Sequence, residues 1–174
     1  MELNYCRRCG ATLSKVPEGY YRCSNGHSIF ASAAPTVGVF FITKDDQVIL
    51  SRRGVEPDKG MLDSFGGFVE ADETTETAIA RELLEETGLA PDDYEPLEFL
   101  CTASAGYLYE GENRPVLSTF FCSAMKPHAK PVAHDDVAEI VTLPLSEIKL
   151  EEFGGDDVKT AFELLLSKRQ DAER

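Results

Sequence analysis

Apolar and polar residues follow one another along the chain in blocks whose spacing predicts strands and helices. Residues 36–43 (TVGVFFIT) form an apolar run of strand length, and residues 47–51 (QVILS) follow after a polar turn, so the two are predicted to form a β-hairpin. Four more strands are predicted, at residues 61–70, 97–103, 116–124 and 138–143. Paired glycines interrupt the strand at 61–70, and residues 107–114 are predicted to be a loop.

Two segments have apolar residues at helical spacing. Residues 72–87 are predicted to form a helix that ends at Gly88, because glycine is favoured in the C-terminal capping position. Residues 158–168 (VKTAFELLLSK) are predicted to form a second helix. This order of elements predicts an α/β fold, in which a mixed sheet carries helices on both faces.

The first 32 residues differ in composition from the rest of the chain. They are short of aliphatic residues and rich in Cys, Gly, Arg and Tyr, so they cannot bury much of a core by themselves. The composition changes at residues 32–35 (SAAP). We therefore predict a small domain at residues 1–32 and a larger one at residues 33–174.

Charge narrows the range of partners. The chain carries 31 acidic and 17 basic residues, a formal net charge of -14, which disfavours binding to nucleic acid and to anionic membranes. It does not exclude a small phosphorylated substrate, because divalent metal ions can reverse the local charge. No apolar run is long enough to span a membrane and no secretory signal is visible, so we expect a cytoplasmic protein.

The predicted helix at residues 72–87 has an apolar side and an acidic side. A helical wheel at about 100° per residue places on the apolar side Ile79, Ala80, Leu83 and Leu84. It places on the acidic side Ala78, Arg81, Glu82, Glu85 and Glu86. Like charges at this spacing cost stability, whereas hard divalent cations such as Mg²⁺ seek carboxylate oxygens. The alternative is an ordinary solvated acidic face.

The stretch from Gly67 to Leu89 resembles the Nudix box at every specified position. The matching residues are Gly67, Glu73, Arg81, Glu82, Leu83, Glu85, Glu86, Gly88 and Leu89. The resemblance covers roughly residues 35–168 and implies the Nudix fold, an α/β/α sandwich with a mixed sheet. It also implies a magnesium-dependent pyrophosphohydrolase that cuts a nucleoside diphosphate linked to a further group, X, by means of a metal-activated water.

The same resemblance assigns roles to individual residues. Glu82, Glu85 and Glu86 are expected to hold Mg²⁺ or Mn²⁺, together with the backbone carbonyl of Gly66 or Gly67. Arg81 and Glu73 resemble the family's buried pair, in which the arginine orients carboxylates. The general base remains open: the candidates are Glu85, Glu86 and, in a loop outside the box, Glu110 and Glu112.

Three residues outside the box are candidates for substrate binding. Arg52 and Arg53 end the second strand, where they can either contact phosphate or form exposed charges at a sheet edge. Tyr107 can stack on a base or ribose, or simply pack the loop.

Cys6, Cys9, Cys23 and His27 place four zinc-ligating side chains in two short turns. A segment with so little apolar content needs a metal in order to fold, so we expect structural Cys₃His zinc; the alternative is reduced cysteines in a disordered arm. A zinc ribbon before a Nudix domain resembles bacterial NADH pyrophosphatases. Their SQPW-type stretch is absent here, since residues 102–107 read TASAGY.

Three functions are compatible with these features. The first is hydrolysis of a nucleoside diphosphate derivative, such as ADP-ribose, an NADH-like dinucleotide or a sugar nucleotide. The second is cleansing of nucleoside triphosphates by the same chemistry, and the third is a non-catalytic domain that senses a nucleotide. By analogy with Nudix relatives, a homodimer is also expected.

Overall fold

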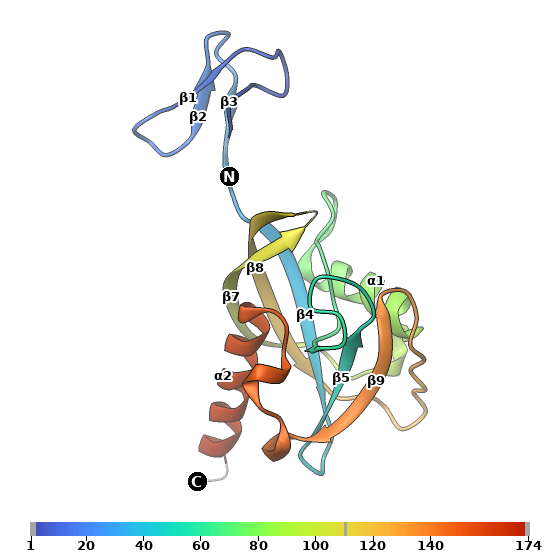
Figure 1. Cartoon of the computed structure of the whole chain (residues 1–174). Helices are drawn as coiled ribbons and strands as arrows, with labels where there is room; N and C mark the ends of the chain where they lie inside the picture. Colours follow the sequence, from blue (N-terminus) through green and yellow to red (C-terminus); the bar gives the residue numbers. More distant parts are fainter. Residues whose placement is uncertain (1–2, 110, 173–174) are drawn as a thin grey trace. The chain divides into compact units, whose positions relative to one another are not determined.

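The chain forms two compact units, Met1–Ala33 and Ala34–Arg174 (Figure 1), in a computed structural model that describes residues 3–109 and 111–172. The first unit holds a three-stranded antiparallel sheet of β1 (Leu13–Lys15), β2 (Tyr21–Cys23) and β3 (Ser28–Ile29). Its buried core consists of Cys6, Leu13 and Cys23. Two of these three side chains are candidate metal ligands, so little apolar surface remains to hold the unit together.

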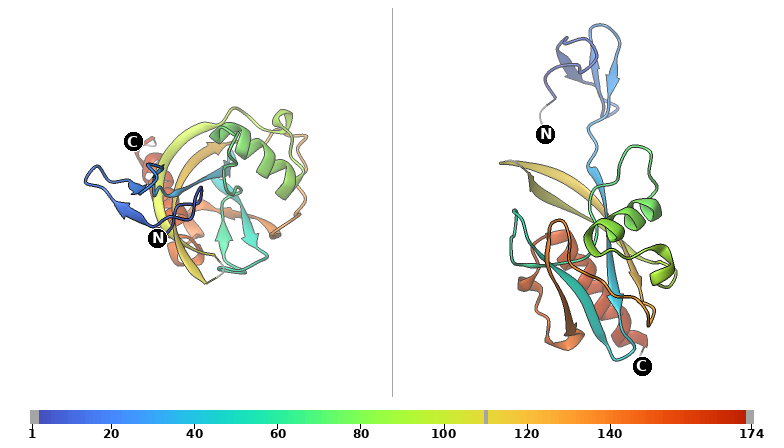
Figure 2. Two further views of the ribbon diagram at one scale, coloured as in Figure 1. Left: turned by 90° about the horizontal axis from the view of Figure 1, so that it is seen from above. Right: turned by 90° about the vertical axis from the view of Figure 1, so that its right-hand side faces the viewer.

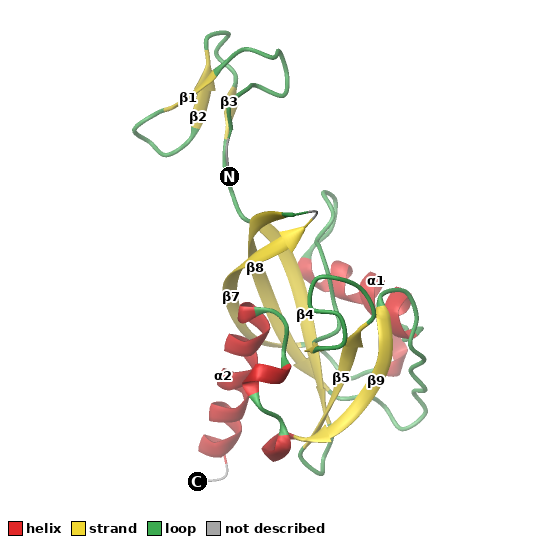
Figure 3. Ribbon diagram, in the orientation of Figure 1, coloured by secondary structure: helices red, strands yellow, loops and turns green. Residues whose placement is uncertain are grey.

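The second unit is built on a mixed six-stranded sheet (Figure 3). Its strands are β4 (Ala34–Ile42), β5 (Gln47–Arg53), β6 (Leu62–Asp63), β7 (Glu98–Tyr109), β8 (Glu112–Ser123) and β9 (Val137–Pro144). The order is β6-β5-β4-β8-β7, with β9 on the other edge of β5. β4 and β8 run parallel, whereas the other named pairs are antiparallel. The mixed sheet predicted from the sequence is confirmed.

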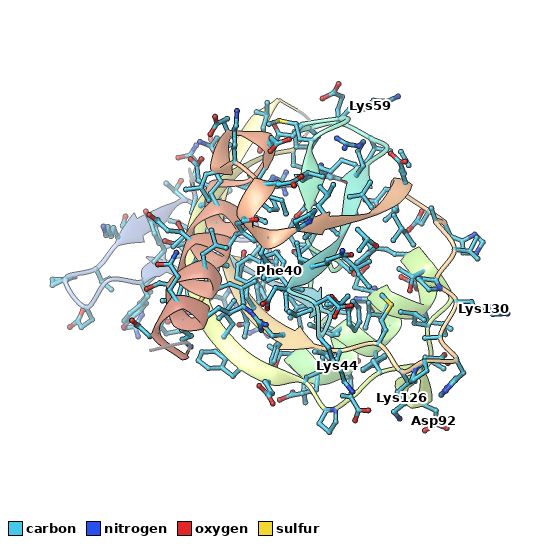
Figure 4. The ribbon with its side chains drawn as sticks, turned by 90° about the horizontal axis from the view of Figure 1, so that it is seen from below. Phe40, Lys44, Lys59, Asp92, Lys126 and Lys130 are labelled. Atoms are coloured by element: carbon cyan, nitrogen blue, oxygen red, sulfur yellow. The ribbon has the colours of Figure 1, made fainter. Side chains whose placement is uncertain are left out.

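Two helices, α1 (Thr75–Thr87) and α2 (Asp156–Ala172), cover opposite faces of the curved sheet (Figure 2). Side chains alternate along β4, so that Val39 and Phe41 pack in the α1 layer and Phe40 packs in the α2 layer. Phe40 accordingly lies in the interior, surrounded by other side chains, in Figure 4. Short 3₁₀ turns cover Pro91–Asp93, Leu145–Glu147 and Leu150–Glu152. The expected α/β/α sandwich is confirmed.

The predicted loop at residues 107–114 is wrong for most of its length. β7 and β8 continue as a hairpin, in which Tyr107 pairs with Arg114 and Tyr109 pairs with Glu112. Tyrosine is favoured in strands, and the Arg114 guanidinium covers the Tyr109 ring at 5.4 Å from its centroid. Exposed side chains on both strands gave this segment a loop-like composition.

Other boundaries shift by a few residues. Helix α1 begins at Thr75 rather than at residue 72, because the Thr74 hydroxyl accepts a hydrogen bond from the backbone N–H of Thr77 and caps the helix. Only Leu62–Asp63 of the segment 61–70 is a regular strand; Phe65 and Phe68 contact β4 through single bridges. Among the described residues, no helix is long and apolar enough to cross a bilayer.

Candidate functional site

Helix α1 carries its acidic residues over a range of burial, from exposed Glu85 to buried Glu86. Ala78, Ile79 and Leu83 are fully buried in the α1 layer of the core, whereas Leu84 is 56% exposed. The helical wheel was therefore wrong for Ala78 and Leu84, since the buried stripe is rotated towards the acidic side. As a consequence, Glu86 is itself buried, with 5% of its surface exposed.

Arg81 donates hydrogen bonds to three carboxylates of the box. Its Nε and Nη2 donate to the two oxygens of Glu73 at 2.8 and 3.0 Å, and Nη1 donates to Glu82 at 2.8 Å and to Glu85 at 3.1 Å. Nη2 also donates to the carbonyl of Phe68 at 2.9 Å, which fixes the guanidinium against the turn before the helix. The hydrogen bonds from Arg81 lower the pKa of Glu73 to about 2.

The paired glycines lie directly against this cluster. The N–H of Gly66 donates to Glu86 Oε2 at 3.0 Å. Gly66 has φ 144°, and a side chain there would collide with the carbonyl of Val37 on β4. At Gly67 an added Cβ would come within 2.5 Å of Glu82 Oε1. Gly66 therefore requires glycine, whereas a side chain at Gly67 would displace the Glu82 carboxylate.

A further carboxylate, Asp136, joins the cluster from the loop before β9. The loop is attached to the end of α1, since the N–H of His134 donates to the carbonyl of Glu86 at 2.8 Å and that of Val132 to the carbonyl of Thr87 at 3.0 Å. Burial, followed by repulsion from Asp136, raises the pKa of Glu86 well above its usual range. Asp136 was missed in the sequence, where nothing distinguishes it from the neighbouring loop residues.

This arrangement fits a divalent cation. Burial raises the pKa of Glu82 as well as that of Glu86, although Arg81 opposes the shift at Glu82. Carboxylates that are desolvated and mutually repelling are stabilised in their charged form by a bound cation. The carbonyl of Gly67 already accepts a hydrogen bond from Val37 at 2.9 Å, whereas that of Gly66 accepts none from the described residues. Gly66 is therefore the better of the two candidate carbonyl ligands.

A cavity of about 290 Å³ opens beside the glycine turn. Its lining residues include Gly66, Gly67, Asp136, Tyr107 and Asp157. This volume lies at the lower end of the range of small-molecule pockets, roughly 300–1,000 Å³. The cavity suits one part of a nucleotide derivative rather than the whole of it.

Of the three residues predicted to bind substrate, two line this cavity. Arg53 donates to Asp63 at 2.7 Å, to the carbonyl of Pro57 at 2.7 Å and to the Tyr107 hydroxyl at 3.4 Å. Arg52 is not among the lining residues; it donates to the carbonyl of Gly60 at 2.8 Å and forms an ion pair at the sheet surface with Glu139 at 3.4 Å.

Asp63 is a partly buried carboxylate, with a side chain 17% exposed, that sequence reasoning missed. Burial raises its pKa to about 6, although the charge of Arg53 acts in the opposite direction and Asp157 adds to the rise. Its position between Leu62 and Phe65 in an apolar segment was the available signal, because a charged residue in a buried strand needs a partner.

Glu112, one of the candidate general bases, is not part of the cluster. It begins β8 with a side chain that is 76% exposed and pairs with Arg114 at 3.4 Å. Glu110 lies outside the described residues.

The four candidate zinc ligands of the first unit converge. Their ligand atoms all lie within 4.8 Å of one another. Cys9 Sγ is 3.8 Å from Cys23 Sγ, and Cys6 Sγ is 3.5 Å from His27 Nδ1. Ligands at zinc–sulfur distances of about 2.3 Å in a tetrahedron stand about 3.8 Å apart, so the set fits zinc. A hydrogen bond from the backbone of Ala11 lowers the pKa of Cys9 to about 6, which favours the thiolate.

Comparison with known proteins agrees with this geometry. The chain is 50% identical to the ADP-ribose pyrophosphatase of Methanocaldococcus jannaschii over 50 residues, 29% of this chain and 30% of that protein. It is 29% identical to the NAD-capped RNA hydrolase NudC of Haemophilus influenzae over 90 residues, 49% of this chain and 34% of that protein. The alignments thus span about a third of the length of these curated relatives.

A solved structure resembles nearly the whole chain. The crystal structure of a NUDIX hydrolase from Nitrosomonas europaea superimposes with a TM-score of 0.68 at 19% identity, covering 97% of this chain and 93% of that one. At this identity the similarity shows the fold. The NUDIX domain family itself matches residues 33–164, which include β4, the box helix and the first half of α2. Because this match spans most of the chain, the protein belongs to the NUDIX family.

Proposed function

We propose that this protein hydrolyses the pyrophosphate linkage of a nucleoside diphosphate derivative, with Mg²⁺ or Mn²⁺ held by the box. The observation that carries the proposal is the convergence of Glu82 and Glu86 with the glycine turn that lines a cavity. A bound divalent cation supplies charge neutralisation at the bridging phosphates and lowers the pKa of a water. The residues of the chain would hold the cation, orient the substrate and take a proton from the water.

Each member of the cluster has a role in this proposal. Glu86 is the buried ligand, Glu82, whose side chain is 13% exposed, is the second, and the carbonyl of Gly66, which accepts no hydrogen bond from the described residues, is the candidate backbone ligand. Glu85, whose side chain is 49% exposed, completes the set at the solvent side. Arg81 and Glu73 act as positioning residues, since Arg81 bonds Glu73 and two of the ligands without lining the cavity.

Asp136 is our candidate for the general base, in preference to Glu85 or Glu86. Its carboxylate accepts no hydrogen bond from any residue in the described part of the chain, and it faces both Glu82 and Glu86. A base that also lines the cavity can take a proton from water beside a bound phosphate. Asp136→Asn should lower kcat by about 10²- to 10⁴-fold in a steady-state assay, while Asp135→Asn, the matched control on the same loop, should retain activity.

The relatives support the class of substrate. One is named an ADP-ribose pyrophosphatase and another an NAD-capped RNA hydrolase, and both names imply an X-linked adenosine diphosphate. The net charge of -14 favours a small nucleotide over a long RNA chain, because RNA would be repelled beyond its capped end.

A substrate panel tests the proposal. ADP-ribose, NADH, a sugar nucleotide and a nucleoside triphosphate are each incubated with Mg²⁺ or Mn²⁺, and release of AMP or another nucleoside monophosphate is separated from release of pyrophosphate. Monophosphate from the X-linked compounds supports the proposal. Pyrophosphate from the triphosphate alone would favour pool cleansing, and tight binding without any product would favour a sensor.

The first unit is proposed to be a structural zinc ribbon at residues 1–32, preceding the hydrolase domain at residues 33–174. The cluster of Cys6, Cys9, Cys23 and His27 supports this division, since its ligand atoms lie close enough for one ion. Metal analysis of the purified protein, with one zinc per chain as the expected result, tests it. A homodimer remains a further prediction, which sedimentation analysis can check.

A further inference from the structure

The four side chains of the proposed zinc site differ in how far they are shielded from solvent. Cys6 is 2% exposed, Cys23 is 5% exposed and His27 is partly buried, whereas Cys9 is exposed. The reaction of a cysteine with a reagent in solution depends on access to its sulfur. Such a reagent therefore reaches Cys9 before the other two cysteines of the cluster.

The two cysteines of the second unit are poorer targets. Cys101 on β7 and Cys122 on β8 are both partly buried. Burial raises the pKa of Cys101, and it raises the pKa of Cys122 to about 11, so both remain protonated near neutral pH. The thiolate is the nucleophilic form of cysteine, and a cysteine that ligates zinc is deprotonated. With zinc bound, Cys9 therefore combines a thiolate with exposure to solvent.

A second sulfur lies close to that of Cys9. Cys23 Sγ is 3.8 Å from Cys9 Sγ, and the side-chain amide of Asn25 donates to Cys9 Sγ at 3.3 Å. A disulfide has an S–S distance of about 2.0 Å, so the two sulfurs would have to approach by about 1.8 Å. The apolar core of this unit is small, so little packing opposes the movement.

We propose that Cys9 is a site of oxidation by hydrogen peroxide and that its oxidation leads to a disulfide with Cys23 and to loss of the zinc. The Cys9 thiolate attacks one peroxide oxygen, so that an S–O bond forms, the O–O bond breaks and hydroxide leaves, which gives a sulfenic acid. The Cys23 thiolate then attacks the sulfur of Cys9, and a second hydroxide leaves as the S–S bond forms. Each thiolate loses one electron, and the peroxide gains both.

The disulfide removes two of the four ligands. Cys6 and His27 remain, and two side chains do not make the closed tetrahedral site of a structural zinc. The first unit should then open, because its buried core consists largely of ligand side chains. The inference rests on the proposed zinc ribbon and is independent of the proposed hydrolysis.

Zinc release from the full chain tests the inference. The zinc-loaded protein is treated with hydrogen peroxide beside a chromogenic zinc indicator, and its cysteines are mapped by alkylation and mass analysis. Zinc should be released, a disulfide should join Cys9 to Cys23, and a thiol reductant with added zinc should restore binding. Retention of zinc in peroxide, or oxidation of Cys101 or Cys122 ahead of Cys9, would overturn the assignment.

Cys9→His keeps four ligand side chains but removes the exposed sulfur. The variant should bind zinc and release it in peroxide at least about 10-fold more slowly than the wild type. Cys101→Ser, which removes a sulfur outside the cluster, is the matched control and should release zinc at the wild-type rate. Equal rates of release from Cys9→His and the wild type would contradict the proposal.

Alkylation of the wild type decides the matter if Cys9→His fails to bind zinc. Iodoacetamide, added to the zinc-loaded protein at less than one equivalent, should label Cys9 first, because the same exposure governs both reactions. Preferential labelling of Cys6 or Cys23 would overturn the assignment.

Metal analysis before the oxidant is added separates this inference from the proposal on which it rests. A purified protein that neither contains nor takes up zinc refutes the zinc ribbon and the oxidation step together. Zinc that is bound and then kept in peroxide refutes only the role of Cys9.

Discussion

The two candidate metal sites of this protein are built in opposite ways. In the first unit, Cys6 and Cys23 are themselves most of the buried core, so the ligands and the interior are the same residues. In the second unit the ligands stand at the edge of a large apolar core, and Arg81 provides a positive charge among them. We infer that the first site needs its metal in order to fold, whereas the second folds first and binds metal afterwards.

The largest expected effect is a loss of catalytic activity in a protein that stays folded. Glu86→Gln should lower kcat by about 10³-fold or more with Mg²⁺, because it removes a buried ligand charge, yet it keeps an oxygen for the N–H of Gly66. The melting temperature should not fall, since burial already disfavours the charged carboxylate. Both are measured on one preparation.

Glu76→Gln is the matched control, since Glu76 is an exposed carboxylate in the first turn of the same helix. It should retain turnover. Near-normal kcat in Glu86→Gln would refute the ligand assignment, and unfolding of that variant would show that the second site is as metal-dependent as the first.

Removal of zinc should affect only the first unit. A chelator, or the substitution Cys23→Ser, is expected to leave residues 1–33 open to proteolysis while the second unit keeps its melting transition, because the first unit has only a small apolar core. Limited proteolysis followed by mass analysis locates the cuts. A first unit that stays protected after chelation would contradict the comparison.

Arg81→Lys should have an intermediate effect. Lysine keeps the charge but loses the paired hydrogen bonds to Glu73 and the bond to the carbonyl of Phe68. We expect kcat to fall about 10- to 100-fold and the free energy of unfolding to fall by about 1–3 kcal/mol. Denaturant titration and steady-state kinetics measure the two changes. A lower free energy of unfolding with an unchanged kcat would mean that Arg81 supports only the fold and not catalysis.

The smallest effect is the pH dependence of the metal-free protein. Burial raises the pKa of Asp63 to about 6 and that of Glu86 well above its usual range, so both favour the folded state at low pH and lose this contribution as the pH rises through their folded pKa values. The pKa of Glu73 is lowered to about 2, so Glu73 favours the folded state as the pH rises, but this opposite effect is confined to pH values below 5. The melting temperature in chelator should therefore fall between pH 5 and pH 7.

Glu86→Gln should make this decline shallower than Glu85→Gln does, although both remove one charge. Mg²⁺ should reverse part of the decline, because it binds the ionised carboxylates. A melting temperature that rises with pH in chelator would mean that the carboxylates are already neutralised by the chain itself.

Local patterns in the sequence were sufficient to predict the layers of the fold and the helix α1 of the candidate site. The apolar run at residues 36–43 contains most of β4, and the box spacing predicted that Glu82, Glu85 and Glu86 lie together. These predictions succeed because helix and strand periodicities are properties of neighbouring residues. The boundary at Thr74 and the extended hairpin at residues 107–114 depend on a cap and on cross-strand pairs, which composition does not reveal.

The sequence by itself determined the α/β architecture, the family, and the residue types that can hold cations. Only the tertiary structure decided that Glu86 is buried and that Asp136 and Asp157 face one cavity. Glu86 lies on α1, Asp136 in the loop before β9 and Asp157 on α2, and their positions follow from the hydrogen bonds of that loop to α1 and from the packing of both helices on the sheet. Such neighbours are set by how strands and helices assemble, and periodicity along the chain contains no information on that step.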